Sequence, residues 1–307
     1  MAKTRPQSLI PQEQLAPLRK LKAWRTWWSL AVVWGQIAGA FTLVALYPYW
    51  YVYLPAVIVV GRNQFALAVL NHEAAHRLLF TSIPLNNWVG EWLCSYPIMA
   101  ELKKYRPYHL QHHAHTQTEG DPDLVLSRPF PVSRSSMTRK LIRDFTGIAG
   151  LRRYYGAVRS TLGKPDQPLL HRLGSMFSKL HGFFITQAVL FGALFALGVP
   201  WLYLLMWWVP MLTWYSYIYR IRNIAEHGGT EETDNALQNT RTTLAPWWSL
   251  WPVAPMNVNY HIEHHLYPLV PWYNLPRVHQ MLIDAGHGPD MNLVPGYTSV
   301  LRSVTTA

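Results

Sequence analysis

The chain has 307 residues, and its formal net charge at pH 7 is +11. Half of the residues are hydrophobic, 14% are aromatic and only 14% are charged, against about 25% charged residues in a typical soluble domain. This composition excludes an ordinary soluble protein and favours an integral membrane protein with aromatic side chains at the membrane surfaces. The single cysteine, Cys94, excludes a disulfide framework, an iron–sulfur cluster and a zinc site built from cysteines.

The first 25 residues form a basic segment with six Lys or Arg and one acidic residue. They contain no short apolar core followed by small residues, the pattern at which a signal peptide is cleaved. We therefore expect residues 1–26 to be a cytosolic N-terminal segment that the protein keeps.

Four apolar segments are long enough to cross a bilayer, which takes about 20 helical residues. They cover residues 27–46, 51–70, 183–199 and 201–219. The connections within the first pair and within the second pair are very short, so each pair is expected to form a helical hairpin. We predict an all-α integral membrane protein with four transmembrane helices in two hairpins, 27–70 and 183–219.

Basic residues flank the predicted spans on one side only. Four of them lie between Arg19 and Arg25, before the first span, and two arginines follow the fourth span. Under the positive-inside rule both chain termini and the central region therefore lie in the cytosol. We expect residues 71–182 to be cytosolic or interfacial, with helices on the membrane surface, and residues 220–307 to be cytosolic.

Two of the predicted helices are expected to protrude from the membrane. A continuous helix from Tyr51 to His76 has a length of about 39 Å, and one from Trp201 to His227 about 40 Å, whereas the hydrocarbon core is about 30 Å thick. Arg62 interrupts the second span. A charge there is either functional or held by polar partners inside the helix bundle, and the sequence leaves both interpretations open.

Three short windows hold eight of the fourteen histidines. Their patterns are HxxxH, HxxHH and HxxHH, and residues three or four apart lie on one face of a helix, so each window directs its imidazoles to one side. Three such groups exceed the four ligands of one protein zinc ion, so their number favours two metal ions in a cytosolic helical cap. The windows are His72/His76, His109/His112/His113 and His261/His264/His265.

The first window also matches HExxH, the helix of zinc proteases in which two histidines bind the metal and the glutamate is the base. A zinc protease needs one further protein ligand, which leaves both HxxHH windows unexplained. Glu73 has a second interpretation, because it lies four residues before Arg77 and can form a helical ion pair with it. A membrane zinc metalloprotease therefore stays a distant alternative. A metal transporter is disfavoured, since transporters bind their ions near the membrane midplane.

Together the three windows resemble the histidine boxes of the membrane-bound fatty acid desaturases and hydroxylases, in the same order and with similar apolar segments between them. The resemblance covers residues 27–279. It implies an all-histidine di-iron centre, with two iron ions as cofactor, that uses O2 as co-substrate and two electrons to attack an unactivated C–H bond. It also implies one domain over residues 1–307.

The same resemblance implies further site residues. A ninth histidine ligand is expected after the last span, where His227 stands, and stearoyl-CoA desaturases have a water-linked Asn four residues before it, where Asn223 stands. His227 can also be a helix C-terminal histidine ahead of a glycine cap. Asp121 and Asp123 follow the second window and can either orient imidazoles or form a turn. No catalytic residue beyond the metal ligands is predicted, and histidines outside the clusters, such as His279, are expected to be ordinary.

The run from 259 to 276 around the third window is similar to box three of acyl-lipid desaturases, so we predict a lipid desaturase that introduces a double bond into a fatty acyl chain. A hydroxylase of a lipid, carotenoid or alkyl chain has the same boxes and stays an alternative. No flavin, haem or iron–sulfur motif is visible, so a ferredoxin or a cytochrome b5-like protein is the expected electron donor. The basic charge fits an acidic donor, and lipid headgroups explain it equally. We expect a multi-pass membrane protein, in the plasma (inner) membrane if bacterial, with no nucleic-acid partner.

Overall fold

The computed structural model describes residues 9–306, so residues 1–8 of the predicted N-terminal segment lie outside it. Three of its helices are long and apolar enough to cross a membrane. They are α2 (Ala23–Leu46), α3 (Trp50–Ala75) and α9 (Leu169–Ala196). These helices cover most of the first three predicted spans, and the chain is mainly helical, so the prediction of a helical membrane protein is confirmed at this level.

Aromatic side chains lie at both ends of α2. Trp24, Trp27 and Trp28 are exposed at its start, and Tyr49 and Trp50 are exposed in the turn that leads to α3. A helix of 24 residues is about 36 Å long. The two aromatic bands are therefore separated by slightly more than the hydrocarbon thickness of a bilayer, as is usual for side chains at its two surfaces.

The fourth apolar segment is not one helix. It forms the π-helix η5 (Tyr203–Trp208), α10 (Val209–Leu212) and α11 (Trp214–His227). Pro210 has no backbone N–H to donate to the preceding turn, and Thr213 has a non-helical ψ of −85°, so the helical ladder is interrupted on both sides of α10. The continuous helix predicted from Trp201 to His227 is therefore wrong.

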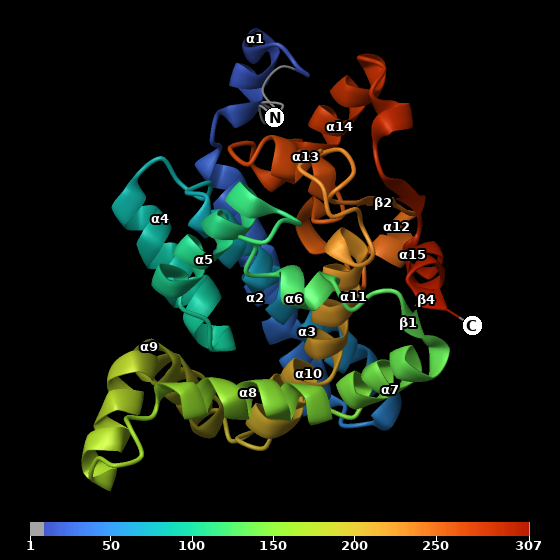
Figure 1. Ribbon diagram of the computed structural model, residues 1–307. Helices are drawn as coiled ribbons and strands as arrows, with labels where there is room; N and C mark the ends of the chain where they lie inside the picture. Colours follow the sequence, from blue (N-terminus) through green and yellow to red (C-terminus); the bar gives the residue numbers. More distant parts are fainter. Residues whose placement is uncertain (1–8, 307) are drawn as a thin grey trace.

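Short helices connect α3 to α9. They are α4 (Ile83–Val89), the π-helix η3 (Gly90–Ser95), the 3-10 helix η4 (Tyr96–Ile98), α5 (Leu102–His115), α6 (Leu124–Ser127), α7 (Arg134–Phe145) and α8 (Ile148–Thr161). Val89 and Cys94 pack with Ala74, so α4 and η3 lie against the end of α3. In Figure 1, α7 and α8 follow one another along one side of the molecule, next to α11 and before the projecting α9.

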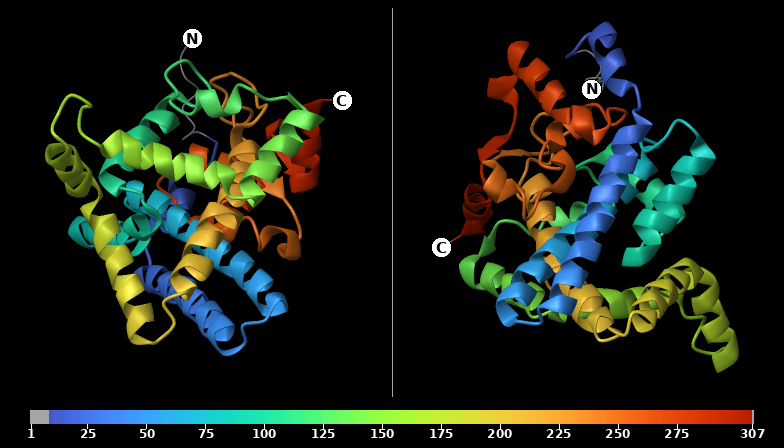
Figure 2. Two further views of the ribbon diagram at one scale, coloured as in Figure 1. Left: turned by 90° about the horizontal axis from the view of Figure 1, so that it is seen from below. Right: turned by 180° about the vertical axis from the view of Figure 1, so that it is seen from behind.

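The remaining elements form a cap. They are α1 (Gln12–Leu15), η2 (Ala16–Arg19), α12 (Trp247–Leu250), η6 (Pro255–Asn257), α13 (His261–Leu266), η7 (Trp272–Asn274), α14 (Leu275–Asp284), η8 (Gly288–Asp290) and α15 (Tyr297–Ser303). Ile10 and Leu15 share an apolar cluster with Ile262, Val278 and Leu282. The N-terminal segment therefore packs against the C-terminal part of the chain, and Figure 1 and the right-hand view of Figure 2 show α1 and α14 at the same end of the molecule.

Four very short strands are the exception to the all-α prediction. β1 (Val132–Ser133) pairs with β4 (Thr305–Thr306), and β2 (Thr242–Leu244) pairs with β3 (Leu293–Pro295), both in parallel. Each pair joins segments that are distant in the sequence. Pairs of two or three residues add local hydrogen bonds to a helical fold and do not change its class.

Arg62 is a charged residue within the apolar part of α3, and its side chain has hydrogen-bond partners there. Its Nε donates a hydrogen bond to the carbonyl oxygen of Trp251 (2.7 Å), and its Nη1 donates to Asn63 Oδ1 (3.3 Å). The guanidinium also lies 5.0 Å from the centre of the Trp251 ring. These contacts favour the interpretation of a charge held inside the bundle, and they tie α3 to the segment that follows α12.

A glycine permits the close approach of α3 and α11. A Cβ atom at Gly61 would lie 2.8 Å from Trp214 Cβ and 3.1 Å from the backbone nitrogen of Tyr215. Such distances are shorter than ordinary van der Waals contact, so the two helices can pack this closely only because residue 61 has no side chain.

We predict that Gly61→Ala destabilises the protein by about 1–3 kcal/mol, the usual cost of forcing an extra methyl group into a packed contact. Gly35→Ala in α2 is the matched control, because a Cβ there has nothing within 4 Å. It should leave stability unchanged or raise it by about 0.5–1 kcal/mol, since glycine disfavours a helix interior. Thermal unfolding in detergent measures both variants, and equal midpoints for the two would contradict the prediction.

Candidate metal centre

Four elements deliver histidines to one place. The end of α3 supplies His72 and the adjoining His76, and the C-terminal residue of α11 is His227. The HxxHH windows lie on α5 and on α13, as their spacing predicted. The nine histidines form two groups, and within each group one donor atom per residue lies within 4.8 Å of the others.

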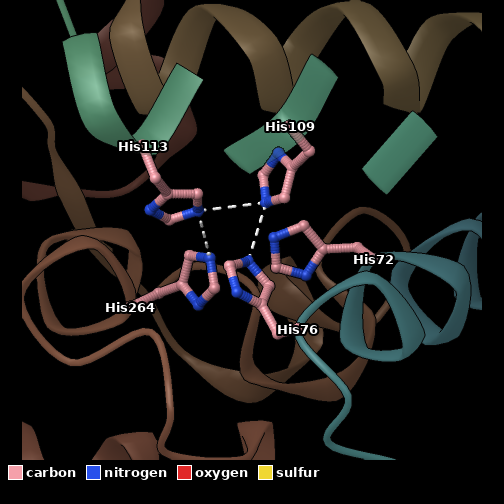
Figure 3. A group of neighbouring side chains, drawn as sticks. All are labelled: His72, His76, His109, His113 and His264. Atoms are coloured by element: carbon pink, nitrogen blue, oxygen red, sulfur yellow. Dashed lines mark hydrogen bonds between the residues drawn. The ribbon is translucent and has the colours of Figure 1, made fainter. Parts of the chain in front are cut away.

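The first group contains five histidines: His72, His76, His109, His113 and His264. Figure 3 shows their rings pointing toward one another from α3, α5 and α13. His109 Nε2 lies 2.9 Å from His76 Nε2 and 3.0 Å from His113 Nε2. His264 Nε2 lies 3.0 Å from His113 Nε2.

The second group contains the other four: His112, His227, His261 and His265. His261 Nε2 lies 2.8 Å from His227 Nε2 and 3.1 Å from His265 Nε2. The groups are adjacent, because the rings of His113 and His265 stack with their centres 4.2 Å apart. His227 is the last residue of α11, as the helix-capping alternative requires, but its ring is not isolated, because it lies among the other three histidines of the second group.

The positions of the imidazole nitrogens suit metal coordination better than hydrogen bonds between the histidines. A neutral imidazole nitrogen carries either one proton or one lone pair, yet His109 Nε2 has two Nε2 neighbours at hydrogen-bonding distance. Two nitrogen ligands about 2.1 Å from one ion and at right angles are about 3.0 Å apart, the spacing seen here. His72 Nε2 is buried and has no hydrogen-bond partner within residues 9–306.

The imidazoles are held in the neutral form that binds metal. Burial, and then the neighbouring charged forms of other histidines, lowers the pKa of these side chains well below the ordinary value of 6.5. The affected residues are His109, His113, His227, His261, His264 and His265. At pH 7 these groups therefore carry lone pairs and no positive charge that would repel a cation.

Asp121 is placed to orient one of these rings. Its Oδ1 accepts a hydrogen bond from His112 Nδ1 at 2.8 Å, which leaves His112 Nε2 free for a metal. The backbone nitrogens of Gln117 and Asp123 also donate to this carboxylate. Asp123 itself lies farther away, with Oδ2 3.8 Å from His112 Nδ1, and its other oxygen accepts a hydrogen bond from the Tyr108 hydroxyl.

Glu73 does not pair with Arg77, so that prediction is wrong. Helix α3 ends at Ala75, and Arg77 is exposed with a left-handed φ of 62°. Glu73 is buried instead: Oε1 lies 3.3 Å from His72 Nδ1, and Oε2 accepts a hydrogen bond from the backbone nitrogen of Trp272. The Glu73 side chain therefore lies between the His72 ring and the Trp272 backbone instead of forming a helical pair on the surface.

Other contacts of the histidines were not foreseen from the sequence. Glu226 Oε1 lies 3.4 Å from His261 Nδ1, and Thr116 Oγ1 lies 3.1 Å from His265 Nδ1. Glu226 also accepts a hydrogen bond from Arg222, a pair whose i,i+4 spacing is a visible signal.

His279 has a structural role, although it was expected to be ordinary. It contacts the buried carboxylate of Glu263 in α13, whose other oxygen accepts a hydrogen bond from Thr242. Glu263 therefore anchors the third window from behind. His115 and His171 are exposed and lie outside both histidine groups.

A cavity of about 510 Å³ opens beside the histidines. His109, His112, His227 and His261 form part of its wall, and Asn223 lines it as well. The rest of the wall is partly apolar, with Met99, Ala100, Ala157 and Leu180, and partly polar, with Tyr105, Tyr108, Asp123, Tyr219, Arg222 and Glu226 among others. A molecule in this cavity can reach histidines of both groups.

Residues 48–292 match the sequence profile of the fatty acid desaturase family, so the chain belongs to this family. This membership makes it an oxidoreductase of lipid metabolism. The match covers the apolar helices and all three histidine windows.

The chain is similar to several characterised relatives. It is 26% identical to the dihydrorhizobitoxine desaturase of Bradyrhizobium elkanii over 280 aligned residues, and this alignment covers 87% of this chain and 75% of the relative. It is 25% identical over 259 residues to the sn-1 acyl-lipid omega-3 desaturase (ferredoxin) of a Synechocystis strain, covering 79% and 70%. The beta-carotene ketolase of a Paracoccus strain is 27% identical over 219 residues, covering 69% and 72%. These relatives differ in their named substrates.

We predict that the metal-free protein loses stability as the pH falls from 7.5 to 5.5. The unfolded chain binds protons at histidines with a pKa of about 6.5, whereas the buried histidines of the folded state do not, so acid favours unfolding. Thermal midpoints of metal-free protein in detergent measure this slope. His171→Gln, at an exposed position, should keep the slope, whereas His109→Gln should reduce it. A flat profile for the unsubstituted protein would contradict the prediction.

Proposed function

We propose that the protein is an O2-dependent di-iron oxidoreductase that introduces a double bond into a fatty acyl chain. The observation that carries this proposal is the convergence of two histidine groups, of five and four members, beside one cavity. Five and four nitrogen donors suit two separate ions, and family membership supports iron and O2 chemistry. Neutral imidazoles alone do not choose between iron, zinc and copper, so the choice of iron rests on the family.

In this proposal His72, His76, His109, His113 and His264 hold one ion, and His112, His227, His261 and His265 hold the other. Asn223 completes the smaller group through a water molecule, because it lines the same cavity as His227 and lies one helical turn before it. When bound, the two ions would activate O2, which is the oxidant, for removal of hydrogen from an unactivated C–H bond.

The protein's own side chains perform the remaining tasks. Asp121, Glu73 and Glu226 hold the rings of His112, His72 and His261 in fixed orientations through their Nδ1 atoms. The 510 Å³ cavity positions the chain that is oxidised. A hydroxylase or ketolase acting on a lipid, carotenoid or alkyl chain is the second candidate, and the similarity to a beta-carotene ketolase favours keeping it.

We also propose the arrangement in the membrane. Helices α2 and α3 form one hairpin, and α9 with the interrupted segment 201–219 forms the other, which gives four spans in a single domain over residues 1–307. Both termini and the metal centre then lie on the cytosolic side, in the plasma (inner) membrane if the protein is bacterial. The aromatic bands of α2 support its position across a bilayer, and the basic residues before it support this orientation.

The two electrons come from a separate protein in this proposal. A ferredoxin is the first candidate, because the name of the similar omega-3 desaturase includes ferredoxin, and a cytochrome b5-like protein is the second. An acidic donor of either kind fits the net charge of +11.

We predict that His112→Ala and His264→Ala each abolish oxidation, because each removes a ligand from a different ion. The measurement is O2-dependent formation of unsaturated or oxygenated lipids in expressing cells, by mass spectrometry, together with iron per purified chain. The unsubstituted protein should hold about two irons per chain. His171→Ala is the control and should form product normally, since His171 is exposed and belongs to neither group. Undiminished product in the two ligand variants would refute the di-iron proposal.

We predict that Asp121→Asn lowers iron retention or activity about 10- to 100-fold, the usual effect of removing a carboxylate that orients a metal-binding histidine. Asp123→Asn should have a smaller effect, because its carboxylate lies 3.8 Å from the same ring nitrogen. Iron content and product formation in the two variants, measured side by side, test the difference. Equal losses would mean that the two aspartates act on the site in the same way, against the geometry.

A further inference from the structure

A second, smaller cavity lies next to the one at the metal centre. It has a volume of about 300 Å³ and lies between α7, α8 and α11. Tyr219 and Asn223 line both cavities, so these two side chains form a shared wall. Nothing in the proposed chemistry uses this second space.

The second cavity carries an excess of positive charge. Lys140, Arg153 and Arg220 line it, and Asp144 is the one carboxylate in its wall. Asp144 accepts hydrogen bonds from Nε and Nη2 of Arg220, the second at 3.0 Å, and so neutralises that residue. The other two cationic side chains, Lys140 and Arg153, are not part of this ion pair.

Neither of these two cations has an acidic group within 4.0 Å among residues 9–306, and the carboxylate of Asp144 acts on Lys140 only from farther away. Arg153 donates to Ser216 Oγ (3.1 Å), and its guanidinium lies 4.9–5.4 Å from the ring centres of Tyr154, Tyr215 and Tyr219. Burial, and then the positive charges of Arg220 and Arg143, lowers the pKa of Lys140. A cavity that holds like charges together in this way is stabilised by an anion.

The surroundings place this cavity at a membrane surface. The segment 134–161, which forms α7 and α8, contains seven Lys or Arg and one acidic residue. The same two helices expose large apolar side chains, namely Ile142, Phe145, Ile148, Leu151 and Tyr155. Basic helices with an exposed apolar face lie in the headgroup region of a membrane.

An apolar groove of about 430 Å³ lies beyond the metal-centre cavity, on the side of η4 and α9. Pro97 lines this groove and Met99, two residues later, lines the metal-centre cavity. On α9, Ile185 lines the groove and Leu180 lines the metal-centre cavity. The metal-centre cavity therefore lies between a cationic cavity and an apolar groove.

We infer that the cavity lined by Lys140, Arg153 and Arg220 binds the anionic phosphate or carboxylate headgroup of the amphiphile whose chain enters the metal-centre cavity past Tyr219 and Asn223. The assignment of the chain rests on the proposed function, whereas the anion site does not. The distance from this headgroup site to the histidines then selects the bond that is oxidised. The substrate class is an anionic single-chain amphiphile or lipid.

The test measures binding without turnover, so its outcome is separate from that of the desaturation assay. The full chain, purified in a neutral maltoside detergent, is titrated with dodecyl phosphate and, separately, with inorganic phosphate, by calorimetry. Dodecyl phosphate should bind at least about tenfold more tightly than inorganic phosphate, because its chain is also buried. Equal affinities would assign the site to a free anion and overturn the amphiphile assignment.

Variants locate the site. Lys140→Gln should weaken dodecyl phosphate binding about tenfold or more, by loss of a charge-assisted hydrogen bond, and Lys140→Arg should restore it. Arg139→Gln is the matched control, since this exposed neighbour on α7 does not line the cavity, and it should bind as the unsubstituted protein does. Thermal midpoints confirm that each variant is folded. Unchanged binding by Lys140→Gln, or an equal loss in Arg139→Gln, would overturn the proposal.

Discussion

Nine imidazoles can share one small buried volume only while they remain uncharged. Each proton added to the cluster would create a cation among its neighbours, and each unpaired buried nitrogen costs free energy. The fold meets this constraint by delivering the rings from four elements and by contacting several Nδ1 atoms with buried side chains such as Glu73, Asp121 and Glu226. The free nitrogens then point inward, where metal ions are the natural partners.

The same constraint explains why the helices pack as they do. His227 lies at the end of α11 and His72 near the end of α3, so these two helices must approach closely. The missing side chain at Gly61 permits that approach, and the contact between Arg62 and the Trp251 carbonyl also holds α3 in place. The charge of Arg62, for which the sequence left two interpretations open, thus helps to position the helix that carries His72.

Much of this could be predicted because its signals are local. The HxxHH spacing places imidazoles on one helical face, and apolar runs of membrane length identify α2, α3 and α9. His227 followed from family resemblance, and the structure brings it to the second group. The break at Thr213 was missed because a membrane helix often tolerates a proline such as Pro210, and hydropathy does not distinguish a kinked helix from an interrupted one.

Contacts across long sequence separations could not be predicted. Glu73 accepts a hydrogen bond from Trp272, 199 residues later, and no local pattern indicates this partner. The helical pair with Arg77 was plausible only if α3 continued past Ala75. His279 and Glu263 also meet through the packing of α14 on α13, a tertiary contact with no signature in spacing.

The division of the histidines between the groups has a consequence for biosynthesis. His264 belongs to the first group and contacts His113, from which it is separated by 151 residues, while the second group needs His261 and His265. Neither group is complete until α13 has left the ribosome, although α3 and α5 emerge much earlier. Closing so long a loop costs chain entropy, and the apolar cluster that joins Ile10 and Leu15 to α14 is available to offset it only at the end of synthesis. If the two groups hold metal as proposed, their full ligand sets form only late in synthesis, and a truncated chain that ends before α13 lacks one histidine of the first group and two of the second.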